Sequence, residues 1–438
     1  MNPESINTGE LDEIRTPVPG PRSRELTTAL RLFESRNVTF VDKDFPIFWE
    51  SASGATVTDV DGNRYIDLTG AFGVANTGHS NPYVAAAISD QAVRLMHGMG
   101  DVHPTEVKVQ LLETLARITP GDLSKTFLAS TGSEAVEAAL KTAMLATGKF
   151  AFAAYHGAYH GLSLGTLEVS GIEKFRAPFA QFVPQRTLFL DYPRANHLST
   201  DEGAAAALDE TKRALSARND IAALIIEPLQ GRGGCIVPPK GYLKGLRELC
   251  DSLGILLIFD EIYTGFGRTG WLFACEQEGV VPDILCIGKA MANGFPISAT
   301  IARPSIMDVW PESPGEALHT STYLGNPMAC AAALANLGEI DRMQLPQRAR
   351  QMGIMLGARL DALRADGKVL DVRGRGLMWG IEFADAKTAE GIVKEALKAG
   401  VILLQAGPQG NVISITPPLV ITQRQLFRAL DLITACTK

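Results

Sequence analysis

Two residues of opposite charge follow two apolar runs near the middle of the chain. Asp260 follows "ILLIF", and Lys289 follows "DILCIG". Apolar runs that alternate with helical segments are typical of buried parallel strands, and the carboxyl ends of such strands share one edge of a sheet. We therefore expect the carboxylate and the amine to point into one crevice. Taken singly, each has a plainer interpretation: a turn or helix-cap aspartate, and a solvated lysine.

A third segment adds a site for an anion. "KTFLASTGSEAVEAALK" has the pattern of a strand, a turn of small residues and a helix. Thr131 and Glu134 have the spacing of a capping box, which is the structural interpretation of this turn. The same turn places the backbone N–H groups of Gly132 and Ser133 at a helix N-terminus, where phosphate binds readily. The Gly-Lys-Ser/Thr of a P-loop is missing, so we expect a small phosphate and not a triphosphate.

An amine, a carboxylate and a phosphate site together match the needs of pyridoxal 5′-phosphate. The amine forms a Schiff base with the aldehyde, the carboxylate keeps the pyridine nitrogen protonated, and the helix terminus holds the phosphate. The segment "AYHGAYHGLSLG" adds two aromatic rings that could stack on the cofactor, Tyr155 and Tyr159, each followed by His-Gly. Ordinary packing is the alternative for both rings.

The glycines of "GFGRTG" have the spacing of a dinucleotide-binding fingerprint, Gly265-x-Gly267-x-x-Gly270. In that fingerprint the glycines follow a strand directly and open a helix, whereas "DEIYT" intervenes here. The next strand also ends at Lys289 and not at an acid that could bind ribose. We therefore expect a mobile or tight loop, and no nicotinamide site.

Composition narrows the class of protein. The chain of 438 residues has 41 Lys and Arg against 48 Asp and Glu, a net charge of −7, with no basic run, so nucleic-acid binding is not expected. The start "MNPESINTGELDEIR" is not a signal peptide, and no apolar stretch is long enough to cross a membrane. Six cysteines without a C-x-x-C pair indicate reduced thiols and a cytoplasmic location. The seven histidines show no metal spacing, and we predict no metal site.

The pattern along the chain predicts an α/β fold. The first forty residues are predicted as a Pro-rich loop ("RTPVPGPRSREL"), followed by a short amphipathic helix and a hairpin around Asp61-Gly62. Strands and helices then alternate. We predict three parts: residues 1–79, the N-terminal segment of a small domain; 80–326, the large cofactor-binding domain; and 327–438, the C-terminal part of the small domain.

From Gly54 to its C-terminus the chain resembles the class III aminotransferases, the family of 4-aminobutyrate and acetylornithine aminotransferases. The resemblance rests on "DVDGNRYIDLTGAFGVANTGH", "STGSEAVEAALK", "AYHG", "IIEPLQGRGG", "FDEIYTGFGRTG", "IGKAMANGFPISA", "TSTYLGNPMACAAAL" and "VRGRGLMWGIEF". It implies the α/β architecture of fold type I, in which a large domain with a mostly parallel sheet flanked by helices joins a smaller α+β domain from both chain ends. It also implies a homodimer with active sites at the interface.

The reaction so implied moves an amino group from an amine or ω-amino acid to a keto acid or aldehyde, through a Schiff base of Lys289. Position by position, the resemblance assigns Asp260 to the pyridine nitrogen and Gly132 and Ser133 to the phosphate. It places these further residues around the cofactor: Tyr159 stacked on the ring with His160 beside it, Ile262 on the opposite face, Glu227 nearby, Tyr263 near the phenolic oxygen, and Thr322 reaching the phosphate from the partner subunit.

The chain departs from the family pattern at three positions. Tyr263 stands where glutamine is frequent, Arg232 where a glutamate is usual, and Ser414 where many members have an arginine that grips the substrate α-carboxylate. In those members the glutamate and arginine form a switch between two substrates. We therefore do not expect 2-oxoglutarate as the default acceptor. Arg232 is either a solvated rim residue or a replacement carboxylate-binding group.

Substrate choice depends on the pocket walls. By family position the candidate apolar walls are Trp49, Phe72, Val74 and the segment 96–99, although core packing is the alternative for each. An apolar entrance without the switch arginine favours an amine or ω-amino acid donor with a hydrophobic portion. Three other functions stay open: a racemase or aminomutase of the same family, a cofactor-binding protein without turnover, and a nicotinamide dehydrogenase.

Overall fold

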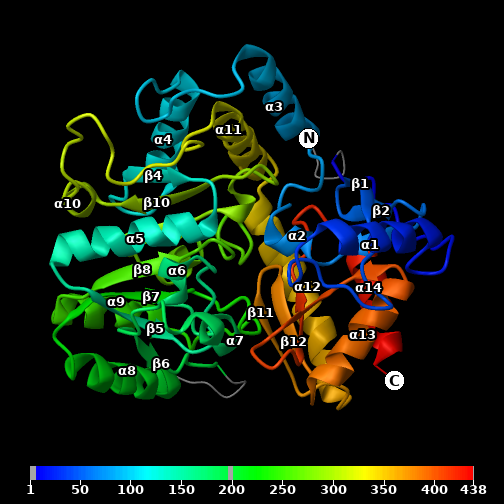
Figure 1. Ribbon diagram of the computed structural model, residues 1–438. Helices are drawn as coiled ribbons and strands as arrows, with labels where there is room; N and C mark the ends of the chain where they lie inside the picture. The colour runs from blue at the N-terminus through cyan, green and yellow to red at the C-terminus, as the bar shows by residue number, and fades with distance from the viewer. Residues whose placement is uncertain (1–5, 196–200, 438) are drawn as a thin grey trace.

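The computed structural model describes residues 6–195 and 201–437. Its largest sheet has seven strands in the order β4 (Lys125–Ala129), β10 (Ser298–Ala302), β9 (Ile284–Ile287), β8 (Leu256–Asp260), β7 (Ile221–Ile226), β5 (Ala151–Tyr155) and β6 (Leu188–Leu190). Strand β10 runs antiparallel to both of its neighbours, and the other pairs are parallel. A mostly parallel sheet flanked by helices confirms the predicted α/β class (Figure 1).

Helices cover both faces of this sheet. On one face α5 (Gly132–Thr147) lies across the strands, and on the other α4 (Glu106–Ile118) and α9 (Tyr242–Leu253) pack on them, with α8 (Asp201–Ser216) against α9. Successive residues of β8 point to opposite faces of the sheet. Ile258 packs in the hydrophobic cluster that contains residues of α5, whereas Leu257 and Phe259 pack in the cluster that contains residues of α9. Because both faces are buried, the strands are apolar throughout and not alternating.

Segments from the two ends of the chain lie together, blue and orange to red in Figure 1. One sheet joins β1 (Trp49–Ser53), β2 (Thr56–Asp59) and β3 (Arg64–Asp67) to β13 (Val401–Ile402), which pairs in parallel with β3. A second sheet has the order β11 (Asp371–Arg375), β12 (Met378–Glu382), β15 (Val412–Ile415) and β14 (Leu404–Ala406). The boundaries at 79/80 and 326/327 stay predictions.

The remaining helices complete the chain. They are α2 (Gly70–Gly73), α3 (Pro82–Arg94), α6 (Leu164–Leu167), α7 (Glu173–Arg176), η2 (Ala177–Phe179), η3 (Ala274–Glu278), η4 (Lys289–Met291), α10 (Pro304–Met307), α11 (Pro327–Arg342), α12 (Leu345–Ala365), α13 (Ala386–Lys398) and α14 (Gln423–Cys436). Helix α11 packs against α3 and α4. Among the described residues, no helix has the length and apolar character that a bilayer span requires.

The N-terminal prediction was wrong about where its helix lies: residues 41–48, between the predicted loop and β1, contain no helix. Helix α1 (Pro21–Phe33) lies inside the segment predicted as loop. Proline is favoured in the first turn of a helix, where its missing N–H is not needed. The predicted hairpin forms between β2 and β3, and its Asp61 carboxylate accepts hydrogen bonds from the backbone N–H of Arg22 (2.7 Å) and Ser23 (2.9 Å). The helix is therefore capped by a residue from another part of the chain, which local sequence does not show.

The glycines of the fingerprint-like segment form a tight turn after β8, as predicted, and do not open a helix. The turn buries Arg268 completely. Its guanidinium donates hydrogen bonds to the carbonyl oxygens of Leu377 (3.0 Å) and Pro417 (2.5 Å) and to the side chain of Asn76. The segment thus ties the large sheet to residues from both ends of the chain.

Candidate active site

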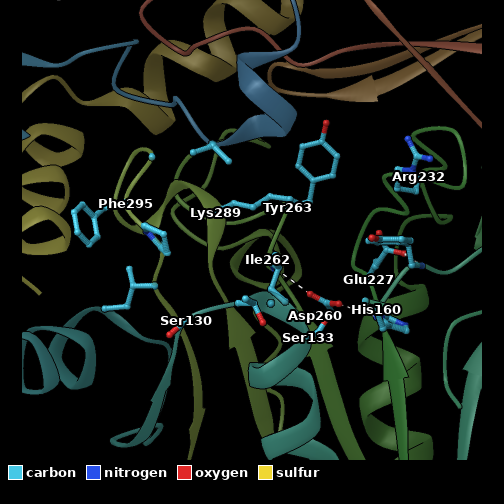
Figure 2. A pocket seen from close by; sticks show the side chains of 18 residues that line it. Ser130, Ser133, His160, Glu227, Arg232, Asp260, Ile262, Tyr263, Lys289 and Phe295 are labelled. Atoms are coloured by element: carbon cyan, nitrogen blue, oxygen red, sulfur yellow. Dashed lines mark hydrogen bonds and ion pairs between the residues drawn. The ribbon is translucent and has the colours of Figure 1, made fainter. Parts of the chain in front are cut away.

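A cavity of about 320 Å³ opens at the carboxyl edge of the large sheet. The structure brings together around it most of the residues singled out in the sequence: Gly132, Ser133, Tyr159, His160, Glu227, Arg232, Asp260, Ile262, Tyr263 and Lys289. Figure 2 shows these side chains converging from several segments that are far apart in the sequence. The residues predicted at the strand ends therefore do lie in a single crevice.

Strand geometry explains this convergence. Asp260 is the last residue of β8, and Lys289 comes two residues after β9, the adjacent parallel strand. Glu227 follows β7 in the same way, and Tyr159 and His160 follow β5. Lys289 has a backbone φ of 44°, in the left-handed region, where the chain turns sharply from β9 into η4.

Asp260 is buried and fully engaged by neighbouring donors. Its Oδ2 lies 2.7 Å from Nδ1 of His160, and its Oδ1 accepts the backbone N–H of Ile262 at 3.1 Å (Figure 2). An ionised carboxylate can only accept hydrogen bonds, so Nδ1 of His160 carries the proton. The other ring nitrogen, Nε2, is buried and has no partner among the described residues.

Glu227 is a second buried carboxylate beside Asp260. It accepts the backbone N–H of Tyr159 (3.0 Å) and of Gly231 (2.9 Å). Burial raises the pKa of Glu227 to about 6, and the charge of Asp260 adds to this effect. His160 and the two backbone donors oppose it. Through its hydrogen bonds to Tyr159 and Gly231, Glu227 links the segment after β5 to the loop that carries Arg232.

The N-terminus of α5 faces the same cavity. Thr131 Oγ1 accepts the N–H of Glu134 at 3.2 Å, and the Glu134 carboxylate accepts those of Ser130 (2.7 Å) and Thr131 (3.3 Å). The capping box predicted from the sequence is therefore present. It leaves the backbone N–H groups of Gly132 and Ser133 without a hydrogen bond in the described part of the chain. A Cβ atom at Gly132 would lie only 3.0 Å from Cδ1 of Ile262, so a larger residue would crowd this edge of the cavity.

Lys289 extends toward Tyr263 and not toward a carboxylate (Figure 2). Its Nζ lies 4.1 Å from the centroid of the Tyr263 ring. Burial lowers the pKa of Lys289 from 10.5 to about 8, although the charges of Asp260 and Glu227 oppose this shift. The phenol oxygen of Tyr263 lies 3.0 Å from Oγ1 of Thr416.

Arg232 forms part of the cavity wall beside Tyr159. Its guanidinium lies 6.0 Å from the centroid of the Tyr159 ring. Within residues 6–195 and 201–437, this guanidinium has no hydrogen bond or ion pair. Ser414, at the position of the family's arginine, is buried, and its Oγ lies 3.6 Å from Sγ of Cys235.

Several predicted residues lie elsewhere in this chain. Trp49 (42% exposed) packs edge-on against His79, and Phe72 (55% exposed) and Thr322 are also on the surface, outside the lining of this cavity. Of the two candidate stacking rings, Tyr155 is core, with its hydroxyl 2.8 Å from that of Tyr242. Tyr159 is the one that faces the cavity.

Sequence reasoning assigned no role to some residues that line the cavity: Ser130, Gly161, Gly294, Phe295, Pro296 and Ile297. The last four belong to "NGFPIS", which begins four residues after Lys289 in a segment already noted for its resemblance. Their place in that segment was a usable signal. The sequence held no such signal for Gly161, because the course of the loop after β5 alone brings this residue to the cavity.

Comparison with known proteins places the chain in a family. The sequence profile of class III aminotransferases matches residues 39–437. An amine transaminase from an uncultivated Pseudomonas species, solved in its PLP-bound form, is 32% identical, with a TM-score of 0.85 over 92% of this chain and 98% of that one. An (S)-enantioselective omega-transaminase from Thermomicrobium roseum is 27% identical, with a TM-score of 0.87 over 97% and 99%.

The ornithine aminotransferase of Toxoplasma gondii is 29% identical, with a TM-score of 0.84 over 97% of this chain and 96% of that one. The likeness therefore covers nearly the whole of each protein. It confirms the predicted fold and the predicted aminotransferase function. It does not support the nicotinamide dehydrogenase that the glycine spacing had suggested. The chain belongs to the class III aminotransferases, a family of pyridoxal-phosphate-dependent transaminases.

Proposed function

We propose that this cavity binds pyridoxal 5′-phosphate and that Lys289 is the amine that engages its aldehyde. The enzyme then moves an amino group from an amine or ω-amino acid to a keto acid or aldehyde. The observation that carries the proposal is the position of Asp260 and Lys289, at the ends of adjacent parallel strands and in the wall of one cavity.

The groups present fit this cofactor. Asp260 supplies an anion for the pyridine nitrogen, fixed in place by His160 and the N–H of Ile262. The free N–H groups of Gly132 and Ser133, at the positive end of α5, suit the phosphate. The missing side chain at Gly132 keeps that end open. Tyr159 and Ile262 supply a flat aromatic and an aliphatic surface for the two ring faces.

When bound, pyridoxal phosphate supplies an aldehyde that condenses with amines and a ring that withdraws electrons from the substrate. The task of Lys289 is to accept a proton at Nζ from the substrate carbon and return it, which requires a neutral amine. With its pKa lowered to about 8, the lysine has an appreciable neutral fraction near neutral pH. Asp260, held in place by its two donors, would lie against the ring nitrogen and favour its protonated form.

We assign Arg232 to the carboxylate of an ω-amino acid substrate. Its guanidinium faces the cavity beside Tyr159 and lacks a protein partner among the described residues. A planar guanidinium with free donors is suited to a carboxylate. The buried Ser414 offers no positive charge at the position where relatives use arginine, so Arg232 takes that task from the opposite wall. Of the predicted apolar walls, Val74 lines this cavity, whereas Trp49 and Phe72 lie on the surface outside its lining.

We also propose a homodimer with shared active sites. The segments around residues 96–102 and 318–326 lie against each other, as shown by the ring contact of His97 with Tyr323 and the hydrogen bond from Asn326 Nδ2 to the Met96 carbonyl. They expose a set of large apolar side chains: Met96, Met99, Val102, Leu318 and Tyr323. Such a patch is typical of an interface. Thr322 is exposed beside these side chains, and we assign it to the phosphate of the partner's cavity.

A cytoplasmic location completes the proposal. Its support is the set of six free cysteines, five of them buried. Of the described residues, no group of three or more His, Cys, Asp or Glu side chains is arranged to hold a metal ion. The chemistry proposed here requires none.

The decisive experiment is an absorbance spectrum of the purified protein loaded with pyridoxal phosphate, before and after a panel of amines and ω-amino acids. We expect a cofactor band that bleaches with donors, with one equivalent of carbonyl product released. Stoichiometric amination of an added acceptor then separates transamination from racemisation or amino migration. A colourless protein that ignores added cofactor would overturn the proposal.

The shared site has its own test. Mixed dimers of Lys289→Ala and Thr322→Val subunits contain one cavity with both defects and one with neither, if Thr322 acts across the interface. We expect such mixtures to recover activity that both parents lack. Recovery no greater than the average of the parents would place Thr322 outside the partner's site.

A further inference from the structure

The amine of Lys289 lies against an aromatic ring. Its Nζ is 4.1 Å from the centroid of Tyr263, well within the range of an attractive contact between a cation and an aromatic face. In the described part of the chain, no ion pair joins this amine to a carboxylate. Figure 2 shows the lysine side chain extended toward Tyr263, away from Asp260.

The hydroxyl of Tyr263 is already committed. Thr416 Oγ1 lies 3.0 Å from the Thr69 carbonyl, to which it can only donate, so its single hydrogen is used there. In the contact between Thr416 and the Tyr263 hydroxyl, also 3.0 Å, the tyrosine is therefore the donor. A chain of hydrogen bonds thus runs from Tyr263 through Thr416 to the backbone.

The ring itself is held between two glycines. A Cβ atom at Gly73 or at Gly231 would overlap the Tyr263 ring from either side. Gly231 is fixed in turn, because its N–H donates to Glu227. The ring also packs against Leu229, Cys235 and Met378. With its edges and hydroxyl fixed, Tyr263 presents one constant face to the lysine.

We propose that Tyr263 is a positioning residue whose ring face holds the amine of Lys289 whenever that amine is not bonded to the cofactor. The inference rests on the proposed role of Lys289. Glutamine is frequent at this position in the family, and its expected contact is with the phenolic oxygen of the cofactor. Tyr263 would have a different role, because it acts through its ring and not through its hydroxyl.

This arrangement keeps the released amine close to the reacting atoms without pairing it to a carboxylate. A salt bridge to Asp260 or Glu227 would favour the charged form strongly and draw the lysine toward the floor of the cavity. The ring attracts the ammonium more weakly and also accepts the neutral amine. Lys289 therefore stays in place through both of its protonation states.

The test replaces Tyr263 by phenylalanine and then by 4-fluoro-, 3,5-difluoro- and 3,4,5-trifluorophenylalanine. Fluorine withdraws charge from the ring face while nearly preserving its shape. For each apoprotein, the rate at which added pyridoxal phosphate develops the cofactor band is measured against pH. The midpoint of that profile reports the pKa of Lys289, since only the neutral amine reacts.

We expect the phenylalanine variant to keep the wild-type midpoint to within about 0.2 pH units, because the face is intact. Fluorination should then lower the midpoint stepwise, by roughly 0.5 to 1.5 pH units in total, because the ammonium loses its attraction. A midpoint that does not respond to fluorination would overturn the inference. A phenylalanine variant that shifts as far as the trifluoro variant would instead assign the effect to the hydroxyl.

Lys289→Ala is measured in parallel to separate this inference from the proposed function. If that variant develops the same band, Lys289 does not engage the cofactor, and the proposed function fails. If it develops no such band while the fluorinated series keeps one midpoint, only the role of the Tyr263 ring is refuted.

Discussion

His160 donates from Nδ1 to Oδ2 of Asp260 across 2.7 Å, with both side chains almost fully buried. The backbone N–H of Ile262 holds the other carboxylate oxygen. The orientation of Asp260 is thus fixed before any ligand arrives. A carboxylate so placed at a strand end can serve a cationic ring nitrogen without rearrangement, and preorganisation of this kind is where electrostatic catalysis obtains most of its effect.

Asp260→Asn should lower kcat by roughly 10²- to 10⁴-fold, because a neutral amide does not keep the ring nitrogen protonated and proton abstraction from the substrate becomes difficult. Single-turnover kinetics with a donor deuterated at the reacting carbon measure the loss directly. The expected signature is a larger isotope effect in the variant.

His160→Ala provides the matched control, since this residue acts through Asp260. It should reduce the same step by about 10-fold, the effect of losing a hydrogen bond to a charged group. In the double variant with Asp260→Asn, His160→Ala should lower the rate of this step by less than about a further threefold, because the two residues share one interaction. Fully multiplicative losses would mean that His160 has an independent role.

Lys289→Ala should abolish the cofactor band and lower turnover by at least about 10³-fold, since both the engaging amine and the proton carrier are gone. Lys289→Arg keeps a positive charge but stays protonated at all working pH values, so it should be equally inactive. Coupled assays and absorbance spectra measure both properties. Near-normal rates in Lys289→Ala would contradict the assignment.

Glu227 should make the stability of the apoprotein depend on pH. Its pKa is raised from 4.5 to about 6 in the folded protein, so the folded state binds the proton more tightly than the unfolded state does. The stabilisation by the protonated form is complete below pH 4.5 and is lost as pH rises through 6. A shift of this size corresponds to about 2 kcal/mol.

Glu227→Gln does not titrate, so the difference in unfolding free energy between wild type and variant should move by about 2 kcal/mol in favour of the variant between pH 4.5 and pH 7. Denaturant unfolding of the two apoproteins at several pH values measures it. A constant difference across this range would show that Glu227 titrates normally.

Arg232→Met should lower kcat/KM for 5-aminopentanoate by roughly 10- to 100-fold, because the substrate carboxylate loses charge-assisted hydrogen bonds. Pentylamine has the same length without the carboxylate, and its kcat/KM should change by less than about threefold. Arg232→Lys retains the positive charge without the planar guanidinium. Its kcat/KM for 5-aminopentanoate should lie between the values of the wild type and of Arg232→Met. Equal losses for both donors would make Arg232 a structural residue.

The sequence was enough to predict the layers of the fold and the strand-end residues. Both depend on local patterns: apolar runs at β8 and β9, and a polar residue where each run ends. The capping box at Thr131 and Glu134 was also predictable, because its two residues are three positions apart.

What could not be predicted depends on distant parts of the chain. The cap of α1 comes from Asp61, and the pairing of His160 with Asp260 spans a hundred residues. The direction of the Tyr263 hydroxyl is set by Thr416, more than 150 positions away. Contacts of this kind leave no periodic signal, because each is fixed only when the sheet and both chain ends have assembled.

The antiparallel strand β10 has a consequence for synthesis. It lies between β4 and β9, so β4 has no strand to pair with until residues Ser298–Ala302 have left the ribosome. The turn that begins α5 is made much earlier, but it gains the hydrogen bond from Ser298 Oγ to the Thr131 carbonyl (2.6 Å) only then. A nascent chain that stops short of Ser298 already contains Asp260 and Lys289. It should still fail to retain pyridoxal phosphate, because the turn that binds the phosphate is not yet fixed in place.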